Sequence, residues 1–281
     1  MENDSVVVTG ATGQVGRATI DALVRRDIRP TALVRRDESF ADCTTISDWL
    51  NSDRAFTAIA CAQTVVHLAG TLNPADHNYE RANIIPTQRV ASAVTPARTR
   101  KLIFLSYVGA SERSTNLYLQ TKARAERLLR ETGVAVTIFR CTHIIGSPDS
   151  PGPTAASVLA SGSKCVTVLG NGKQRVAPVY RGDVIAAIES AIISGQAGTF
   201  DLQGPEEMSF DDLVRLLNGT VDISITHIPM FVARLLQFVG PKLPGPLIDI
   251  MLNDSRSDHP TAHSAFGLSL TPLGRVWSRA G

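Results

Sequence analysis

The tyrosine and lysine of the segment "YLQTK" are the residues best suited to chemistry. Tyr118 and Lys122 are four positions apart, so on a helix both side chains leave the same face. A nearby ammonium favours the phenolate and is expected to lower the pKa of the tyrosine from its usual value of about 10. Tyr118 could then give a proton to a carbonyl oxygen as negative charge develops there. The pattern is more specific because it follows the apolar run "KLIFLSYVGA" after one loop.

Short apolar runs alternate with helical patterns along the first half of the chain, and these elements must position both side chains. Each pair of runs is separated by a segment long enough for a crossover helix. This alternation predicts an α/β fold with a doubly wound parallel sheet that helices cover on both faces. The predicted strands are Val6–Thr9, Thr31–Val34, Thr64–Ala69, Leu102–Ser106 and Ala135–Arg140, and the predicted helices are Val15–Arg25, Asn83–Val94 and Leu117–Glu131.

Three glycines mark the turn between the first predicted strand and the first predicted helix. Gly10, Gly13 and Gly16 form G-x-x-G-x-x-G between "VVVTG" and "RATIDALVRR". Glycine lets the backbone approach a pyrophosphate closely, and the exposed N–H groups at the helix start attract its charge. The motif in this context predicts dinucleotide binding. We assign six residues of the turn to the cofactor: Gly10, Thr12, Gly13, Gln14, Val15 and Gly16.

Two arginines after the second predicted strand indicate which dinucleotide is bound. An NAD-binding fold usually carries an acidic residue about 20 residues past the glycines, where it accepts hydrogen bonds from the adenosine ribose. Here Arg35 holds that place and Arg36 follows it. A guanidinium cannot accept such bonds, but it pairs well with the 2′-phosphate of NADP. We therefore expect NADP(H), with Asp37 as an alternative partner for the ribose.

The composition limits the partners of the protein. The chain has 281 residues, is 43% hydrophobic and carries a net charge of +2, which gives no sign of a nucleic-acid partner. We expect a monomer or homodimer that binds a small molecule. The start "MENDSVVVTG" lacks the features of a signal peptide, and no charge-free stretch reaches the roughly 18 residues of a membrane span. A cytoplasmic location without stable membrane insertion is expected.

A metal site is not expected. Cys43, Cys61, Cys141 and Cys165 show none of the paired spacings of a zinc site, and we interpret them as reduced thiols. His259 and His263 are four apart like a metal pair, but Pro260 disfavours a regular helix from His259.

Several segments together resemble a known superfamily. "TGATGQVG", "VVHLAG", Asn83 in "RANIIPTQRV" and "YLQTK" are similar to the extended and atypical branches of the short-chain dehydrogenases/reductases. The similarity runs nearly end to end, since "LGNGKQRVAPVYRGDV" resembles a later landmark of these branches. The chain resembles most the atypical group that includes the NADPH-binding accessory subunit of respiratory complex I and NmrA-like proteins.

The resemblance implies a fold and roles for further residues. It implies a Rossmann sheet with a small, mainly helical C-terminal substrate lobe. Carried over by position, Asp48 would meet the adenine, and Ala69 and Gly70 would line the cofactor. Asn83 would brace the central helix, and Lys122 would hydrogen-bond the nicotinamide ribose.

The sequence departs from the family pattern at the donor for the substrate carbonyl. Active members carry a serine near the end of the fifth strand, and here the position corresponds to Ser106 or, by register, to Tyr107. Losing one such donor typically costs about two to three orders of magnitude in rate. His143, after the sixth predicted strand, is assigned to the nicotinamide pocket, where it donates to the substrate or serves as a structural histidine.

The character of the sequence changes after about residue 150. We expect the nucleotide-binding domain to cover 1–150 and to resume at about 177–200, with 151–176 and 201–281 forming the substrate lobe. Ser209, with Asp212 three residues on, predicts a helix start. The apolar stretch Ile228–Leu252 is expected to pack over the substrate cleft, and contact with a membrane surface or a lipophilic ligand is the alternative.

Three functions fit these features. We favour an NADPH-dependent reductase of a carbonyl or related unsaturated group on a small, hydrophobic metabolite, with Tyr118 as proton donor. The second is a non-catalytic NADPH-binding assembly factor or redox-sensing regulator. The third is a sugar-nucleotide epimerase or dehydratase, which usually holds NAD tightly and is disfavoured by Arg35.

Overall fold

A seven-stranded parallel sheet forms the centre of the computed structural model, which describes residues 5–152, 164–219, 223–229, 231–232 and 244–278. The strand order is β3-β2-β1-β4-β5-β6-β11. The strands are β1 (Val6–Thr9), β2 (Thr31–Leu33), β3 (Thr44–Ile46), β4 (Thr64–His67), β5 (Lys101–Tyr107), β6 (Val136–Cys141) and β11 (Gly198–Leu202). The predicted doubly wound parallel sheet is therefore confirmed.

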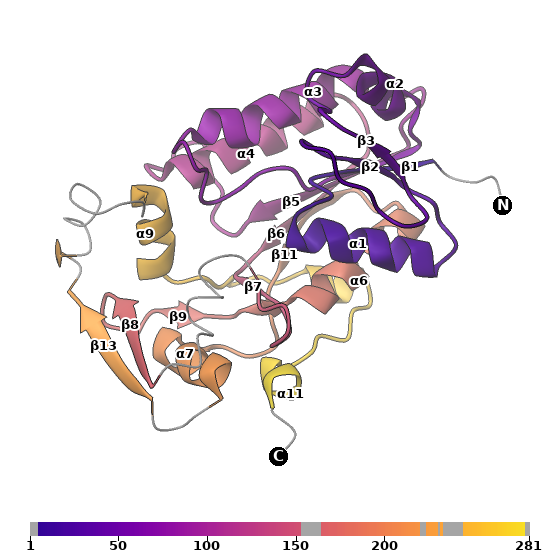
Figure 1. The fold of residues 1–281 in the computed structure, drawn as a ribbon. Helices are drawn as coiled ribbons and strands as arrows, with labels where there is room; N and C mark the ends of the chain where they lie inside the picture. The colour runs from indigo at the N-terminus through magenta and orange to yellow at the C-terminus, as the bar shows by residue number, and fades with distance from the viewer. Residues whose placement is uncertain (1–4, 153–163, 220–222, 230, 233–243, 279–281) are drawn as a thin grey trace.

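Helices cover both faces of this sheet, as Figure 1 shows. One face is covered by α1 (Gln14–Arg25) and α6 (Arg181–Ser194), and the other by α2 (Asp53–Cys61), η1 (Glu80–Ile84), α3 (Ile85–Ala93) and α4 (Leu117–Arg130). Because side chains alternate along a strand, Val8 packs in the first core with Ile188, whereas Val7 packs in the second with Ile59 and Leu129. Burial on both faces explains why the central strands are continuous apolar runs.

The start of α4 is fixed by Asn116. Its side-chain oxygen accepts hydrogen bonds from the backbone N–H groups of Tyr118, at 3.0 Å, and Leu119, at 3.2 Å. These bonds satisfy two donors that the first helical turn leaves without an internal partner. The helix that carries Tyr118 and Lys122 therefore begins at a defined residue, directly after the loop that follows β5.

The C-terminal region combines short strands with helices, whereas the resemblance implies a mainly helical lobe. Its strand pairs are β8 (Cys165–Leu169) with β13 (Ser224–Ile228), β9 (Arg175–Val176) with β12 (Met208–Ser209), and β10 (Val179–Tyr180) with β7 (Ile144–Ile145). Its helices are α7 (Phe210–Asn218), α9 (Gly245–Leu252), α10 (Ala262–Ala265) and α11 (Leu273–Trp277). The predicted helix start is confirmed, because Ser209 Oγ accepts a hydrogen bond from Asp212 N at 3.1 Å.

The last part of the chain returns to the large sheet. Phe266, just after α10, packs edge-to-face on Phe139 of β6, with 5.1 Å between ring centroids, and on Phe200 of β11, at 5.0 Å. Thr271 donates two hydrogen bonds, from its backbone N–H and its hydroxyl, to the carboxylate of Asp183 in α6 at 2.7 and 2.8 Å. The C-terminal residues thus help to cover the edge of the sheet.

Some predicted segments fall outside the described residues. These are 153–163, 220–222 and 279–281 of the expected substrate lobe, and 230 and 233–243 of its apolar stretch Ile228–Leu252. In the remainder of the chain, no helix combines the length and apolarity required to cross a bilayer.

Truncation of Phe139 tests the contribution of the aromatic cluster to stability. Phe139 is fully buried, so Phe139→Ala should lower the free energy of unfolding by about 3–5 kcal/mol through lost burial and the cavity left behind. Ile193→Ala is the control, because Ile193 is 69% exposed and its truncation should change the free energy by less than about 0.5 kcal/mol. Urea denaturation measures both, and equal effects would contradict the packing described.

Candidate functional site

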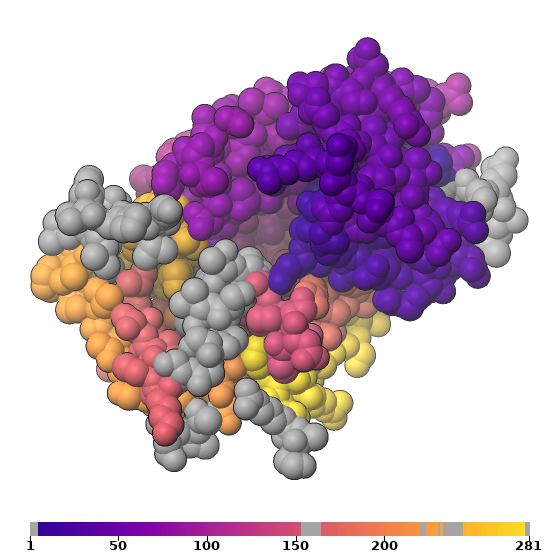
Figure 2. Space-filling view, in the orientation of Figure 1, coloured from indigo at the N-terminus to yellow at the C-terminus, as the bar shows by residue number. Residues whose placement is uncertain are grey.

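A cavity of about 390 Å³ lies at the carboxyl ends of the central strands, where α/β sheets bind ligands. In the space-filling view the surface is recessed between the N-terminal half, in indigo and magenta, and the C-terminal region (Figure 2). Most residues that the sequence assigns to the site line this cavity: Gly10, Gly13, Gln14, Val15, Gly16, Gly70, Ser106, Tyr107, Tyr118, Lys122 and His143.

The glycine turn packs against the backbone at the end of β4. Gly10 has a φ of +67°, and a Cβ built there would lie 2.6 Å from the carbonyl carbon of Leu68. A Cβ on Gly16 would lie 2.2 Å from the carbonyl oxygen of Gly10. Only glycine fits these positions without displacing backbone. Gly13 directly precedes α1 and has no side chain to cap it, which leaves N–H groups at the helix start for an anion.

The residues assigned to the adenosine end lie outside the cavity. Arg35 and Arg36 are exposed just after β2, and Asp48 is exposed just after β3. The two segments run side by side, because Trp49 N donates a hydrogen bond to Val34 O at 3.3 Å. Five predicted cofactor residues are absent from the cavity lining: Thr12, Arg35, Arg36, Asp48 and Ala69.

Asn83 holds the loop that follows β4. Its side chain accepts a hydrogen bond from Thr71 N at 3.0 Å and donates one to Thr71 O at 3.2 Å. It also donates to Tyr79 O at 3.3 Å, within the turn where η1 forms a π-helix. Such turns are rare and occur often at functional sites. Asn83 therefore connects its helix to the loop after β4, and Thr71 of this loop lines the cavity.

Burial dominates the electrostatics of Tyr118 and Lys122. Lys122 Nζ donates a hydrogen bond to Leu105 O at 2.8 Å and lies 5.9 Å from the centroid of the Tyr118 ring. Burial lowers the pKa of Lys122 to about 8. Burial, followed by the neighbouring Tyr107, raises the pKa of Tyr118. The expected lowering of the tyrosine pKa is thus wrong for this structure, because burial raises the pKa and the Lys122 ammonium donates to Leu105 O instead.

The two candidates for the family serine differ in their contacts. The hydroxyl of Tyr107 lies 2.8 Å from Ser255 Oγ and 3.3 Å from His143 Nδ1. Ser106 Oγ is buried and has no hydrogen-bond partner within the described residues. Ser106 is therefore the one whose hydroxyl is available to a ligand in the cavity that both residues line.

Three buried polar atoms of this cavity lack partners in the part of the chain that the structure describes. They are Gln14 Oε1, Ser106 Oγ and His143 Nε2, and each belongs to a residue that lines the cavity. Buried polar atoms are usually hydrogen-bonded, so these three atoms are candidate partners for a ligand in the cavity. Together with the glycine turn, these residues fit a dinucleotide and a small substrate.

A buried histidine beneath the site escaped the sequence-based prediction. His67 Nδ1 lies 2.7 Å from Thr9 Oγ1, its Nε2 lies 3.0 Å from Thr87 Oγ1, and Thr9 Oγ1 accepts from Ala69 N at 3.3 Å. Burial, assisted by Lys122, lowers the pKa of His67 to about 3, so the ring stays neutral. The sequence feature that could have indicated this buried residue is a histidine inside the apolar run "TVVHLA".

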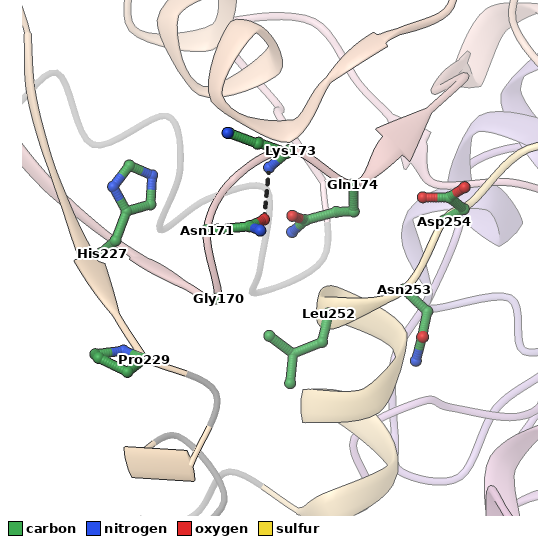
Figure 3. Close-up of a pocket in the computed structure, with 9 residues that line it drawn as sticks. All are labelled: Gly170, Asn171, Lys173, Gln174, His227, Pro229, Leu252, Asn253 and Asp254. Carbon is green, nitrogen blue, oxygen red and sulfur yellow. Dashed lines mark hydrogen bonds between the residues drawn. The ribbon is translucent and has the colours of Figure 1, made fainter.

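A second and larger cavity, of about 1080 Å³, lies in the C-terminal region (Figure 3). It holds none of the predicted site residues, and its lining is mostly polar and exposed. Helix α9 lies between the two cavities, because Leu247 and Met251 line the first and Leu252 the second. Across the described ranges, no group of three His, Cys, Asp or Glu side chains could hold a metal ion.

Residues 10–166, more than half of the chain, match a family of NAD(P)H-binding domains, and the protein belongs to this family. It is of the atypical short-chain dehydrogenase/reductase type, as the sequence predicts. Ceramide reductase of Caulobacter vibrioides is 29% identical over 270 residues, which cover 94% of this chain and 81% of that protein.

Respiratory proteins are further relatives. The mitochondrial NADH dehydrogenase (ubiquinone) 1 alpha subcomplex subunit 9 of Dictyostelium discoideum is 25% identical over 238 residues, or 79% of this chain. The chain spans 66% of the length of that subunit, just under two thirds.

Solved structures confirm the Rossmann-like fold. MoeE5 in complex with UDP-glucose and NAD superposes with a TM-score of 0.77 at 19% identity, over 98% of this chain and 96% of that one. UDP-glucuronic acid 4-epimerase from Bacillus cereus in complex with NAD gives 0.75 at 17% identity, with the same coverage. These identities support the fold alone. Family and relatives together define an NAD(P)-dependent oxidoreductase-like protein.

Substitution of Gly16 tests the glycine turn. The new methyl group of Gly16→Ala would meet Gly10 O at 2.2 Å, so the turn must open. Backbone strain on the order of 1–3 kcal/mol should raise the dissociation constant for NADPH by about tenfold or more. Gly274→Ala is the matched control, because nothing lies within 4 Å of a Cβ there. Fluorescence titration measures both, and wild-type affinity in Gly16→Ala would refute the role of the turn.

Proposed function

We propose that the protein is an NADP-dependent reductase of a carbonyl group on a small, apolar metabolite, with Tyr118 as the proton donor. The observation that carries the proposal is that Tyr118, Lys122 and Ser106 line one cavity together with the glycine turn. The nicotinamide, when bound, supplies the hydride.

Each of the three side chains has a distinct part in this reaction. Tyr118 is neutral because burial raises its pKa, so its hydroxyl carries the proton that the substrate oxygen needs. Lys122 is charged below a pKa of about 8 and stabilises negative charge that develops near the phenol. Ser106 Oγ donates a hydrogen bond to the same substrate oxygen, which supplies the partner it otherwise lacks.

The lining of the cavity supports an apolar substrate. Beyond the polar residues, its sides are formed by side chains from β7, α7 and α9, namely Ile144, Ile145, Phe210, Leu213, Leu247 and Met251. Burial of apolar surface stabilises a complex in proportion to the area removed from water. The similarity to a protein named ceramide reductase supports the same substrate character.

The preference for NADP rests on the loop after β2. Thr9 of β1 is in register with Leu33 of β2, so the chain leaves both strands at the same edge of the sheet. Arg35 and Arg36 follow β2 at this edge, and both are exposed. Their guanidinium groups suit a 2′-phosphate. We further propose that the protein acts in the cytoplasm as a monomer or homodimer, with the substrate lobe formed by 151–176 and 201–281.

A non-catalytic NADPH-binding role is the second candidate. It is favoured by the hydrogen bond that directs Lys122 Nζ to Leu105 O at 2.8 Å. The similarity to complex I subunits points the same way. Such a protein would bind NADPH and turn over no carbonyl compound.

Tyr118→Phe separates the two roles. Loss of the proton donor should lower kcat by about 10²- to 10⁴-fold without changing NADPH affinity. Tyr79→Phe is the matched control, because it removes a neighbouring hydroxyl that bonds Leu72 O at 2.9 Å. Its effect should stay within about tenfold, the worth of one neutral hydrogen bond. Steady-state reduction of a panel of lipophilic ketones supplies the readout, and full activity in Tyr118→Phe would eliminate the assigned role.

Arg35→Ala tests the cofactor preference. Charge-assisted bonds to the 2′-phosphate should be lost, which raises the dissociation constant for NADPH about 10- to 100-fold and leaves NADH binding nearly unchanged. Arg98→Ala is the control, because Arg98 is exposed just before β5, at the amino ends of the strands and opposite the cavity. Calorimetric titration with both nucleotides provides the comparison. Equal losses for NADPH and NADH would reject the phosphate assignment.

A further inference from the structure

A row of aromatic rings follows the cavity from the large sheet into the C-terminal region. Successive rings meet edge to face, with centroids 6.4 Å apart for Tyr79 and Tyr118, 5.8 Å for Tyr118 and Tyr107, and 6.0 Å for Tyr107 and His143. Phe210 of α7 continues the row, 6.5 Å from His143. Tyr118 and His143 therefore lie on either side of Tyr107 and line one cavity.

The imidazole of His143 presents one nitrogen without a partner. Nδ1 lies 3.3 Å from the hydroxyl of Tyr107, whereas Nε2 is buried and makes no hydrogen bond within the described residues. Burial lowers the pKa of His143 to about 4, so the ring is neutral near pH 7. A neutral imidazole has one N–H donor and one acceptor nitrogen, and a bond at one nitrogen decides the role of the other.

Ser255 fixes the orientation of this imidazole through Tyr107. Ser255 is 1% exposed, its backbone N–H donates to Arg175 O at 2.9 Å, and its carbonyl accepts from Ala177 N at 2.9 Å. Two backbone bonds thus hold the residue while its Oγ lies 2.8 Å from the Tyr107 hydroxyl. The Tyr107 hydroxyl is held in turn beside His143 Nδ1.

The direction of the protons in this chain sets the tautomer of His143. If Ser255 donates to Tyr107, then Tyr107 donates to Nδ1 and Nε2 carries the proton. In the reverse order, Nδ1 donates to Tyr107 and Nε2 is an acceptor. A hydroxyl group on a ligand satisfies Nε2 in either case, because it both donates and accepts.

We propose that His143 is a specificity-determining residue that binds a hydroxyl group of the substrate, and that Ser255 and Tyr107 are its positioning residues. The proposal rests on the reductase function and narrows its substrate class. The favoured substrates are apolar ketones that carry a hydroxyl group besides the reacting carbonyl. The carbonyl lies at Tyr118 and Ser106, and the hydroxyl lies beyond the Tyr107 ring at His143.

Discrimination follows from the buried nitrogen. When a ketone without the hydroxyl fills the cavity, Nε2 stays without a hydrogen bond. The hydroxyl group of a hydroxyketone supplies that hydrogen bond. The wild-type protein should therefore favour the hydroxyketone by about 10- to 100-fold in kcat/KM over the plain ketone of equal chain length.

The test compares one matched pair of substrates across variants, with NADPH as reductant. In His143→Leu the preference should fall to nearly onefold, while His143→Gln should keep part of it because an amide donates and accepts. Ser255→Ala and Tyr107→Phe should reduce the preference by loosening the imidazole. His263→Gln is the control, because His263 is exposed on α10, and it should match the wild type.

A purely structural His143 predicts a different pattern. In that case, replacing His143 would lower the turnover of both ketones equally, together with the melting temperature or the NADPH affinity. The ratio of kcat/KM for the two ketones would not change. An unchanged ratio in His143→Leu, or a wild-type ratio near one, overturns the proposal. If the wild type reduces neither ketone, the reductase function fails. The ratio of the two ketones' dissociation constants for the NADPH-loaded protein then decides the role of His143 by the same criterion.

Discussion

The close approach of the glycine turn to the end of β4 is the constraint on which the site depends. A Cβ on Gly10 or Gly16 would overlap the backbone, at 2.6 Å from Leu68 C and 2.2 Å from Gly10 O respectively. Because neither glycine has a Cβ, the chain can reverse direction within a few residues, and α1 begins at the carboxyl ends of the parallel strands. β4, β5 and β6 end at the same edge. The loop bound by Asn83 follows β4, Ser106 and Tyr107 end β5, and His143 follows β6.

Desolvation sets the chemical state of this edge. The same burial that keeps His67 and His143 neutral lowers the pKa of Lys122 to about 8 and raises that of Tyr118. At the cavity, Ser106 Oγ and His143 Nε2 are uncharged and have no hydrogen-bond partner within the described residues, so they are suited to bind an oxygen atom of a ligand. Burial thus keeps the phenol of Tyr118 protonated.

Local patterns of sequence predicted the features that depend on local spacing. The apolar runs predicted β1, β2, β4, β5 and β6 within a few residues, because strands buried on both faces need continuous apolar side chains. The glycine turn and the pair Tyr118 and Lys122 were recognisable for the same reason. The strand β3, with the sequence "TTI", is too short and polar to produce such a pattern, and the strands of two residues in the C-terminal region are too short. Ser255 could not be predicted, since its bond to Tyr107 joins residues 148 positions apart.

The covering of the cavity by late residues has a consequence for the order of folding. The segment that defines the family, 10–166, supplies the glycine turn, Tyr118 and His143. Phe210, Met251 and Ser255 are synthesised afterwards, and β11 adds the edge strand of the sheet only at Gly198–Leu202. A growing chain therefore carries its glycine turn before the C-terminal residues that complete the lining of the cavity have been made. The cavity can form only after the C-terminal region has been synthesised.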